Sequence, residues 1–151
     1  MESRRVVITG IGTINPIGNN IEEYFANLEK GVSGSDIITA FDASKFAARV
    51  ACEVKNFDPS LFFDRKELRK HDRYSQFAMV AATEAVEDAA FGEDVNRRRC
   101  GVVWGSGIGG LGTFFQECMD YAKGGNSLGL VLFLCFASLM WLSSCTLGCH
   151  V

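Results

Sequence analysis

Cysteine and histidine are the residues best suited to chemistry in this sequence, which contains six cysteines and two histidines. A thiolate beside an imidazole is the arrangement of cysteine-dependent acyl transfer, and the same residue types can hold zinc. The motif "CTLGCH" offers at most three ligands, two of them adjacent, which is poor spacing for a metal: Cys145, Cys149 and His150. Three other cysteines lie in segments predicted to be buried strand or helix: Cys52, Cys100 and Cys118. We predict core packing for these three, solvation for His71 among its charged neighbours, and neither a metal site nor a catalytic Cys–His pair.

A glycine motif could bind a dinucleotide. Gly105, Gly107 and Gly110 fit G-x-G-x-x-G between a predicted strand and a predicted helix, where glycine lets the backbone approach a pyrophosphate. That site also requires an acidic residue about 20 positions further on to hold the ribose. No acidic residue follows Asp120. We therefore predict a close-packed turn and no cofactor.

A run of basic residues, "DRKELRKHDR", could bind an acidic partner. It contains five cations within nine positions: Arg65, Lys66, Arg69, Lys70 and Arg73. In one continuous helix these residues would share a face, because side chains three or four positions apart are neighbours. Spacing alone favours a solvated face, as for most charge runs. The net charge of −3 argues against a nucleic-acid partner, which needs a basic excess.

The elements that would position these groups follow from the apolar pattern. β-Branched and apolar runs predict buried strands at residues 6–9 and 100–104, each followed by glycines, and a short extended segment at 48–54. One helix is predicted between a cap at Asn19 or Asn20 and a stop at Gly31, and a mainly helical region begins at Asp58 and Pro59. Alanine-rich residues 73–90 and residues 111–125 predict two further helices.

Strands that alternate with helices predict the α/β class, and a length of 151 residues predicts one domain. The N-terminal "MESRRVVITG" runs from charges straight into a strand, so no secretory signal is expected. We therefore expect a cytoplasmic protein with reduced thiols.

Five collinear blocks carry a family resemblance: "RRVVITGIGTINPIGNN", "GVSG", "FDASKFAARVACEVKNF", "DRKELRKHDRYSQFAMVAATEA" and "GVVWGSGIGGLGTF". Together they resemble the β-ketoacyl-acyl-carrier-protein synthases of fatty acid synthesis, closest to the type II enzyme, over residues 4–125. The resemblance implies a partial thiolase-like fold, namely the opening part of its first α/β half. It also implies a homodimer in the intact family and acyl carrier protein as partner.

The resemblance assigns roles to a few residues of this sequence. Ile108 matches the family position that gates the acyl pocket, and Lys66, Arg69 and Lys70 match positions that dock carrier protein. Members of the family condense an acyl thioester with malonyl-carrier protein by means of a cysteine nucleophile and two histidines. Those three groups lie beyond the matching region, so we expect a truncated, inactive chain with no catalytic residue. A non-catalytic fragment that binds carrier protein or a synthase is the alternative.

The C-terminal segment, residues 126–151, contains no Asp, Glu, Lys or Arg. After "KGG" the family continues with a segment like "PRFSPFFV". Codons can be chosen for residues 127–135 such that the nucleotide sequence, read from the third nucleotide of the first codon, encodes that same string. We therefore interpret residues 126–151 as an out-of-frame tail. The other interpretation is a small tail-anchored membrane protein, because about 20 apolar residues can span a bilayer. Membrane insertion is the weaker interpretation, because the segment contains serine, threonine, cysteine and glycine and lacks a flanking aromatic belt.

Overall fold

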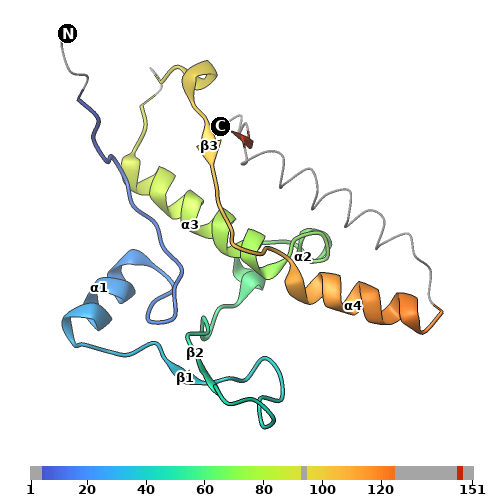
Figure 1. Ribbon diagram of the computed structural model, residues 1–151. Coiled ribbons are helices and arrows are strands. Elements are labelled where there is room, and N and C mark those ends of the chain that lie inside the picture. Colours follow the sequence, from blue (N-terminus) through green and yellow to red (C-terminus); the bar gives the residue numbers. More distant parts are fainter. Residues whose placement is uncertain (1–4, 93–94, 125–145, 148–151) are drawn as a thin grey trace. The chain divides into compact units, whose positions relative to one another are not determined.

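The computed structural model describes residues 5–92, 95–124 and 146–147 (Figure 1). The chain divides into two compact units, residues 1–68 with 76–91 and residues 69–75 with 92–151. The first unit contains α1, β1, β2, the 3-10 turn η1, α2 and most of α3, and the second contains η2, β3, α4 and β4. In chain order the elements are α1 Ile21–Glu29, β1 Asp36–Ile37, β2 Val50–Ala51, η1 Pro59–Leu61, α2 Arg65–Leu68, α3 Arg73–Ala89, η2 Arg97–Arg99, β3 Val102–Val103, α4 Leu111–Ala122 and β4 Thr146–Leu147.

Helix α1 begins and ends where the sequence predicts. The side chain of Asn20 accepts a hydrogen bond from the backbone N–H of Glu23 at 2.8 Å, which satisfies one of the free donors at the helix start. Gly31 follows the helix with a φ of +66°, a left-handed conformation that glycine adopts without strain. The predicted cap and stop are both confirmed.

The helical region after Asp58 is divided into three pieces. Asp58 caps η1 by accepting from the N–H of Ser60 at 2.9 Å, as expected for a helix start, but this 3-10 turn ends at Leu61. The short helix α2 follows, and α3 confirms the alanine-rich helix. Ala90, with a φ of +45°, ends α3 in the left-handed region.

The predicted strand at residues 6–9 is wrong. The structure assigns no strand there, and Val6, Val7 and Ile8 are exposed. A strand needs a neighbour with which to pair its backbone, and the described part of the chain provides none for this run. Its apolar side chains therefore remain outside the core.

The glycines that follow this run pack against α3 instead. A Cβ at Gly10 would lie 2.2 Å from the carbonyl oxygen of Ala85, and one at Gly12 would lie 2.0 Å from that of Ala81. Real Cβ atoms do not approach a backbone oxygen so closely, so both positions require glycine. The backbone of residues 10–13 is thereby held directly on the helix.

Two carboxylates of α3 fix the same segment through its backbone. Asp88 accepts from the N–H of Ile11 at 2.9 Å, and Glu84 accepts from that of Thr13 at 2.8 Å. The second oxygen of Glu84 accepts from the N–H of Ile21 at the start of α1, also at 2.8 Å. Glu84 therefore joins the N-terminal segment, α1 and α3 within the first unit.

The strands form two antiparallel ladders. Strand β1 pairs with β2 through Asp36 opposite Ala51 and Ile37 opposite Val50, and β3 pairs with β4. Residues 50–51 confirm the extended segment in shorter form, but the buried strand predicted at 100–104 is reduced to Val102–Val103, with Val103 exposed. The described ladders thus contain no parallel sheet of the kind that the α/β prediction implies.

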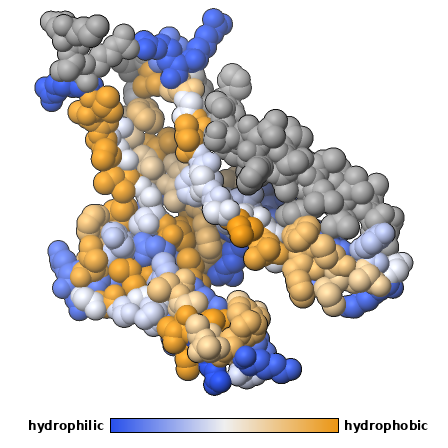
Figure 2. Space-filling view, viewed as in Figure 1, coloured by the Kyte–Doolittle hydropathy of each residue, from blue (hydrophilic) through white to orange (hydrophobic). Residues whose placement is uncertain are grey.

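The apolar core of the described chain is small. Four buried apolar residues form it: Ala43, Phe63, Val80 and Ala81. Phe57 adds a stacked contact to Phe62 and an edge contact to Phe77, with ring centroids 6.1 and 4.9 Å apart. Many large apolar side chains are exposed, and Figure 2 shows them as orange areas on the surface. Much apolar surface thus remains available for other protein segments to cover.

Candidate functional site

The glycine-rich turn before α4 carries Ile108. The side chain of Ile108 is 75% exposed, and an added Cβ at Gly105 or Gly107 would meet nothing within 4 Å. The prediction of a close-packed turn is therefore wrong for these two glycines. Gly110 begins α4 with a φ of +68° and supplies no side-chain cap.

One face of this turn is nevertheless fixed by residues 69–75 of the same unit. A Cβ at Gly109 would lie 2.6 Å from Cζ of Tyr74, so the glycine backbone packs directly on the tyrosine ring. The hydroxyl of Thr113, in the first turn of α4, donates a hydrogen bond to the carboxylate of Asp72. Ile108 therefore lies between Gly107, beside which there is free space, and Gly109, which packs on Tyr74. The sequence offered no signal for these contacts beyond the additional glycine at position 109.

The basic run does not form one helical face. Helix α2 ends at Leu68 and α3 begins at Arg73, so the continuous helix assumed for residues 65–73 is absent. Asp64 accepts from the N–H groups of Lys66 and Glu67, both at 2.7 Å, and thereby caps α2. The three matched cations are all exposed: Lys66, Arg69 and Lys70. Lys66 belongs to the first unit and the other two belong to the second.

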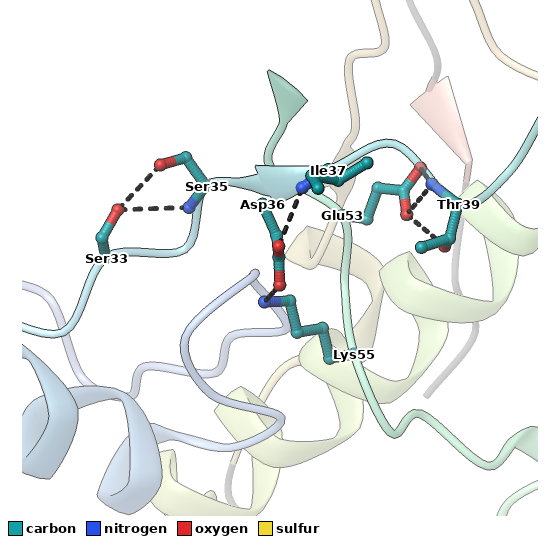
Figure 3. Close-up of polar contacts among 7 residues, drawn as sticks. All are labelled: Ser33, Ser35, Asp36, Ile37, Thr39, Glu53 and Lys55. Atoms are coloured by element: carbon teal, nitrogen blue, oxygen red, sulfur yellow. Dashed lines mark hydrogen bonds and ion pairs between the residues drawn. The ribbon is translucent and has the colours of Figure 1, made fainter. Parts of the chain in front are cut away.

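The β1–β2 region holds a polar network that sequence reasoning missed (Figure 3). Nζ of Lys55 lies 2.8 Å from Oδ2 of Asp36, and this hydrogen bond, with the N–H of Ile37 and the lysine charge, lowers the pKa of Asp36. The carboxylate of Glu53 accepts from the backbone N–H and the hydroxyl of Thr39. Both acids accept hydrogen bonds from backbone N–H groups and thereby stabilise the backbone at and beside β1.

A polar hollow of about 190 Å³ lies beside the start of α1. Its lining includes Asn15, Asn19, Glu23, Asn27 and Lys55. The amide nitrogen of Asn19 donates to the carbonyl of Lys55 at 2.9 Å, while its buried Oδ1 has no hydrogen-bond partner among the residues that the structure describes. The hollow can accept a small hydrogen-bond donor, but it contains no cysteine or histidine.

The cysteines do not occupy the expected places. Cys52 and Cys100 are exposed and Cys118 is half-buried, so core packing is wrong for the first two. His71 is half-buried rather than fully solvated. Within the described ranges no cluster of three or more His, Cys, Asp or Glu side chains could hold a metal ion. Cys145, Cys149 and His150 lie outside the described residues.

None of the helices that the structure describes has the length and apolar composition needed to cross a membrane. Except for residues 146 and 147, the uncharged segment 126–151 lies outside the described residues.

Comparison with protein families identifies the chain. Residues 3–133 match the family model described as "Beta-ketoacyl synthase, N-terminal domain". The chain belongs to the beta-ketoacyl synthase family. The matched range ends inside the uncharged segment, eight residues beyond the region in which we recognised the resemblance.

Several curated relatives of this beta-ketoacyl synthase chain carry the name 3-oxoacyl-(acyl-carrier-protein) synthase 2. The protein of Coxiella burnetii is 48% identical over 112 residues, which are 74% of this chain and 27% of the relative. That of Staphylococcus aureus strain COL is 47% identical over 125 residues, covering 79% of this chain and 30% of the relative. The Synechocystis protein is 46% identical over 112 residues, with the same shares as the first. The chain thus spans less than a third of these relatives' length.

A solved structure shows a similar fold. The structure titled "The ishigamide ketosynthase/chain length factor" matches with a TM-score of 0.54 and 45% sequence identity. The match covers 60% of this chain and 23% of that chain. The chain therefore has part of a ketosynthase fold, which confirms the partial thiolase-like architecture in its coarse form.

Proposed function

We propose that this chain is the N-terminal part of a type II 3-oxoacyl-acyl-carrier-protein synthase, which condenses malonyl-acyl carrier protein with an acyl thioester in fatty acid biosynthesis. The observation that carries this proposal is identity of 46–48% to proteins of that name across three quarters of the chain. Carrier protein is the expected partner, the cytoplasm the expected location, and a homodimer the expected state of the intact enzyme.

The chemistry requires groups that we do not find in this chain. A thiolate must attack the acyl thioester, and fixed hydrogen-bond donors must stabilise the oxyanion that results. Cys52 and Cys100 are exposed free cysteines, and the thiol of Cys100 donates a hydrogen bond to the backbone carbonyl of Asn96. The chain on its own is therefore proposed to be inactive, with residues 126–151 translated out of frame.

Ile108 is proposed to gate the acyl pocket of the intact enzyme. Ile108 is exposed, and an added Cβ at Gly107 would meet nothing within 4 Å, whereas Gly109 packs on the ring of Tyr74. Ile108 is therefore free to change rotamer while the turn stays in place. In the frame-corrected full-length enzyme, Ile108→Phe should shorten the acyl chains that are accepted. The product chain-length profile measures this, and an unchanged profile would remove the gate assignment.

Lys66, Arg69 and Lys70 are proposed to dock the acidic carrier protein. All three cations are exposed, and complementary charge raises the association rate and orients the partner more than it raises affinity. In the frame-corrected enzyme, Lys66→Glu with Arg69→Glu should raise KM for carrier-protein substrates roughly tenfold, and added salt should reduce the difference.

The control for this prediction changes the charge equally elsewhere. Lys45→Glu with Arg98→Glu alters two other exposed cations and should leave KM unchanged. Small thioester substrates, which need no docking, should react normally with both variants. If the docking variant loses activity on both substrate types equally, the basic residues are structural and the assignment to carrier protein fails.

A further inference from the structure

Two segments that lie far apart in the sequence are joined within the second unit. Residues 69–75, between the end of α2 and the first turn of α3, belong to the same compact unit as the glycine-rich turn at 105–110 and α4. Tyr74 and Asp72 make two contacts between these segments, and neither residue has a role in the function proposed above. Both contacts lie within five residues of Ile108, on its C-terminal side.

The ring of Tyr74 holds the residue directly after Ile108. A Cβ at Gly109 would lie 2.6 Å from Cζ of the ring, 2.8 Å from Cε2 and 3.0 Å from Cε1, so the glycine backbone lies against the outer part of the ring. No larger residue fits there unless the half-buried tyrosine moves. Added Cβ atoms at Gly105 and Gly107 would meet nothing within 4 Å, so this contact is confined to one side of Ile108.

The carboxylate of Asp72 holds the first turn of α4, because it accepts a hydrogen bond from the hydroxyl of Thr113. Gly110, the residue that begins this helix, has no side chain with which to cap it, and its carbonyl accepts from the N–H of Phe114 at 2.9 Å. A negative charge near the N-terminal end of a helix is favourable, since the free N–H groups there carry partial positive charge. The backbone that follows Ile108 is therefore fixed at two points.

We propose that Asp72 and Tyr74 are positioning residues for the acyl-pocket gate. With the turn held in place, the gate opens only when the side chain of Ile108 changes rotamer, and an acyl chain long enough to reach past it must displace that side chain. Without the two contacts the whole turn can move, so the free-energy cost of admitting a long chain falls and long and short chains are discriminated less. The inference rests on the proposed function and on Ile108 as its gate.

A matched pair of variants tests each contact in the frame-corrected enzyme. Thr113→Val removes the hydroxyl at nearly constant shape, whereas Thr113→Ser keeps it. Gly109→Ala places a Cβ against the tyrosine ring, whereas the Cβ added by Gly112→Ala would meet nothing within 4 Å. Thr113→Val and Gly109→Ala should raise the ratio of kcat/KM for long over short acyl substrates about fivefold, and the two controls should keep the parent ratio. A merely structural role would lower kcat/KM equally for all chain lengths.

The present chain provides an independent readout of the same contacts. The hydrogen-exchange rate of the Phe114 amide, measured by NMR and corrected for neighbouring residue type, should rise about fivefold in Thr113→Val and Gly109→Ala and stay constant in the two controls. Unchanged exchange in both variants overturns the inference, as does an active corrected enzyme whose chain-length ratio is unchanged or lowered in both. A corrected parent enzyme that forms no product refutes the proposed function instead, and the gate with it, whatever the exchange rates show.

Discussion

Replacing Gly12 with alanine should strongly destabilise the first unit of this chain. The added Cβ would lie 2.0 Å from the carbonyl oxygen of Ala81 and 2.7 Å from the backbone nitrogen of Ala85. Both contacts are backbone atoms inside α3, so neither can move aside as a flexible side chain would. Overpacking of this kind costs about 3 kcal/mol, a large part of the stability that a small domain has. The expected result is a urea transition, followed by circular dichroism, whose midpoint lies at a markedly lower urea concentration than that of the parent chain.

The control for this prediction is Gly101→Ala. An added Cβ at Gly101 meets nothing within 4 Å, and its φ lies outside the left-handed region. This variant should unfold at the same urea concentration as the parent chain, within about 0.5 kcal/mol. If both alanine variants keep the parent transition, the close packing of residues 10–13 on α3 is refuted.

Helices with local signals were the predictable part of this fold. Asn20 and Gly31 delimit α1 from within a dozen residues, and the alanine-rich run specifies α3 through propensity alone. The break at Leu68 was missed because the cap at Asp64 starts a separate short helix. Nothing in the apolar pattern distinguishes one helix from two across such a break.

The strand prediction for residues 6–9 failed for a different physical reason. The run Val6–Ile8 has strand composition, but a strand is stable only when its backbone pairs with a neighbour. Pairing is a property of distant segments, which β propensity does not contain. The glycines that follow Ile8 contact α3 more than 60 residues away, and only the structure reveals this.

The roles proposed for the site residues come from the family resemblance, and the contacts that support these residues had no signal in the sequence. Ile108 and the exposed cations were selected through resemblance to the family, and the structure shows all of them accessible. The contacts of Asp72 with Thr113 and of Tyr74 with Gly109 join residues more than 30 positions apart. The Glu53 network near β1 was missed because an acidic residue that binds backbone N–H groups has no distinctive sequence pattern.

Purified as it stands, the chain should form no carbon–carbon bonds. The proposed enzyme needs a thiolate nucleophile and oxyanion donors, and loss of a nucleophile alone lowers turnover by several orders of magnitude. The frame-corrected gene, in which the reading frame shifts within the codon of Ser127 so that it encodes "PRFSPFFV" and continues in that frame, should encode an active condensing enzyme.

One measurement tests this account most directly: the rate of 3-oxoacyl-carrier-protein formation from acyl- and malonyl-carrier protein, with the two proteins assayed side by side. We predict product from the frame-corrected protein and a rate at least about a thousandfold lower from the present chain. Product from the present chain at a comparable rate, or none from the corrected protein, would contradict the proposal that this chain is the inactive N-terminal part of a condensing enzyme.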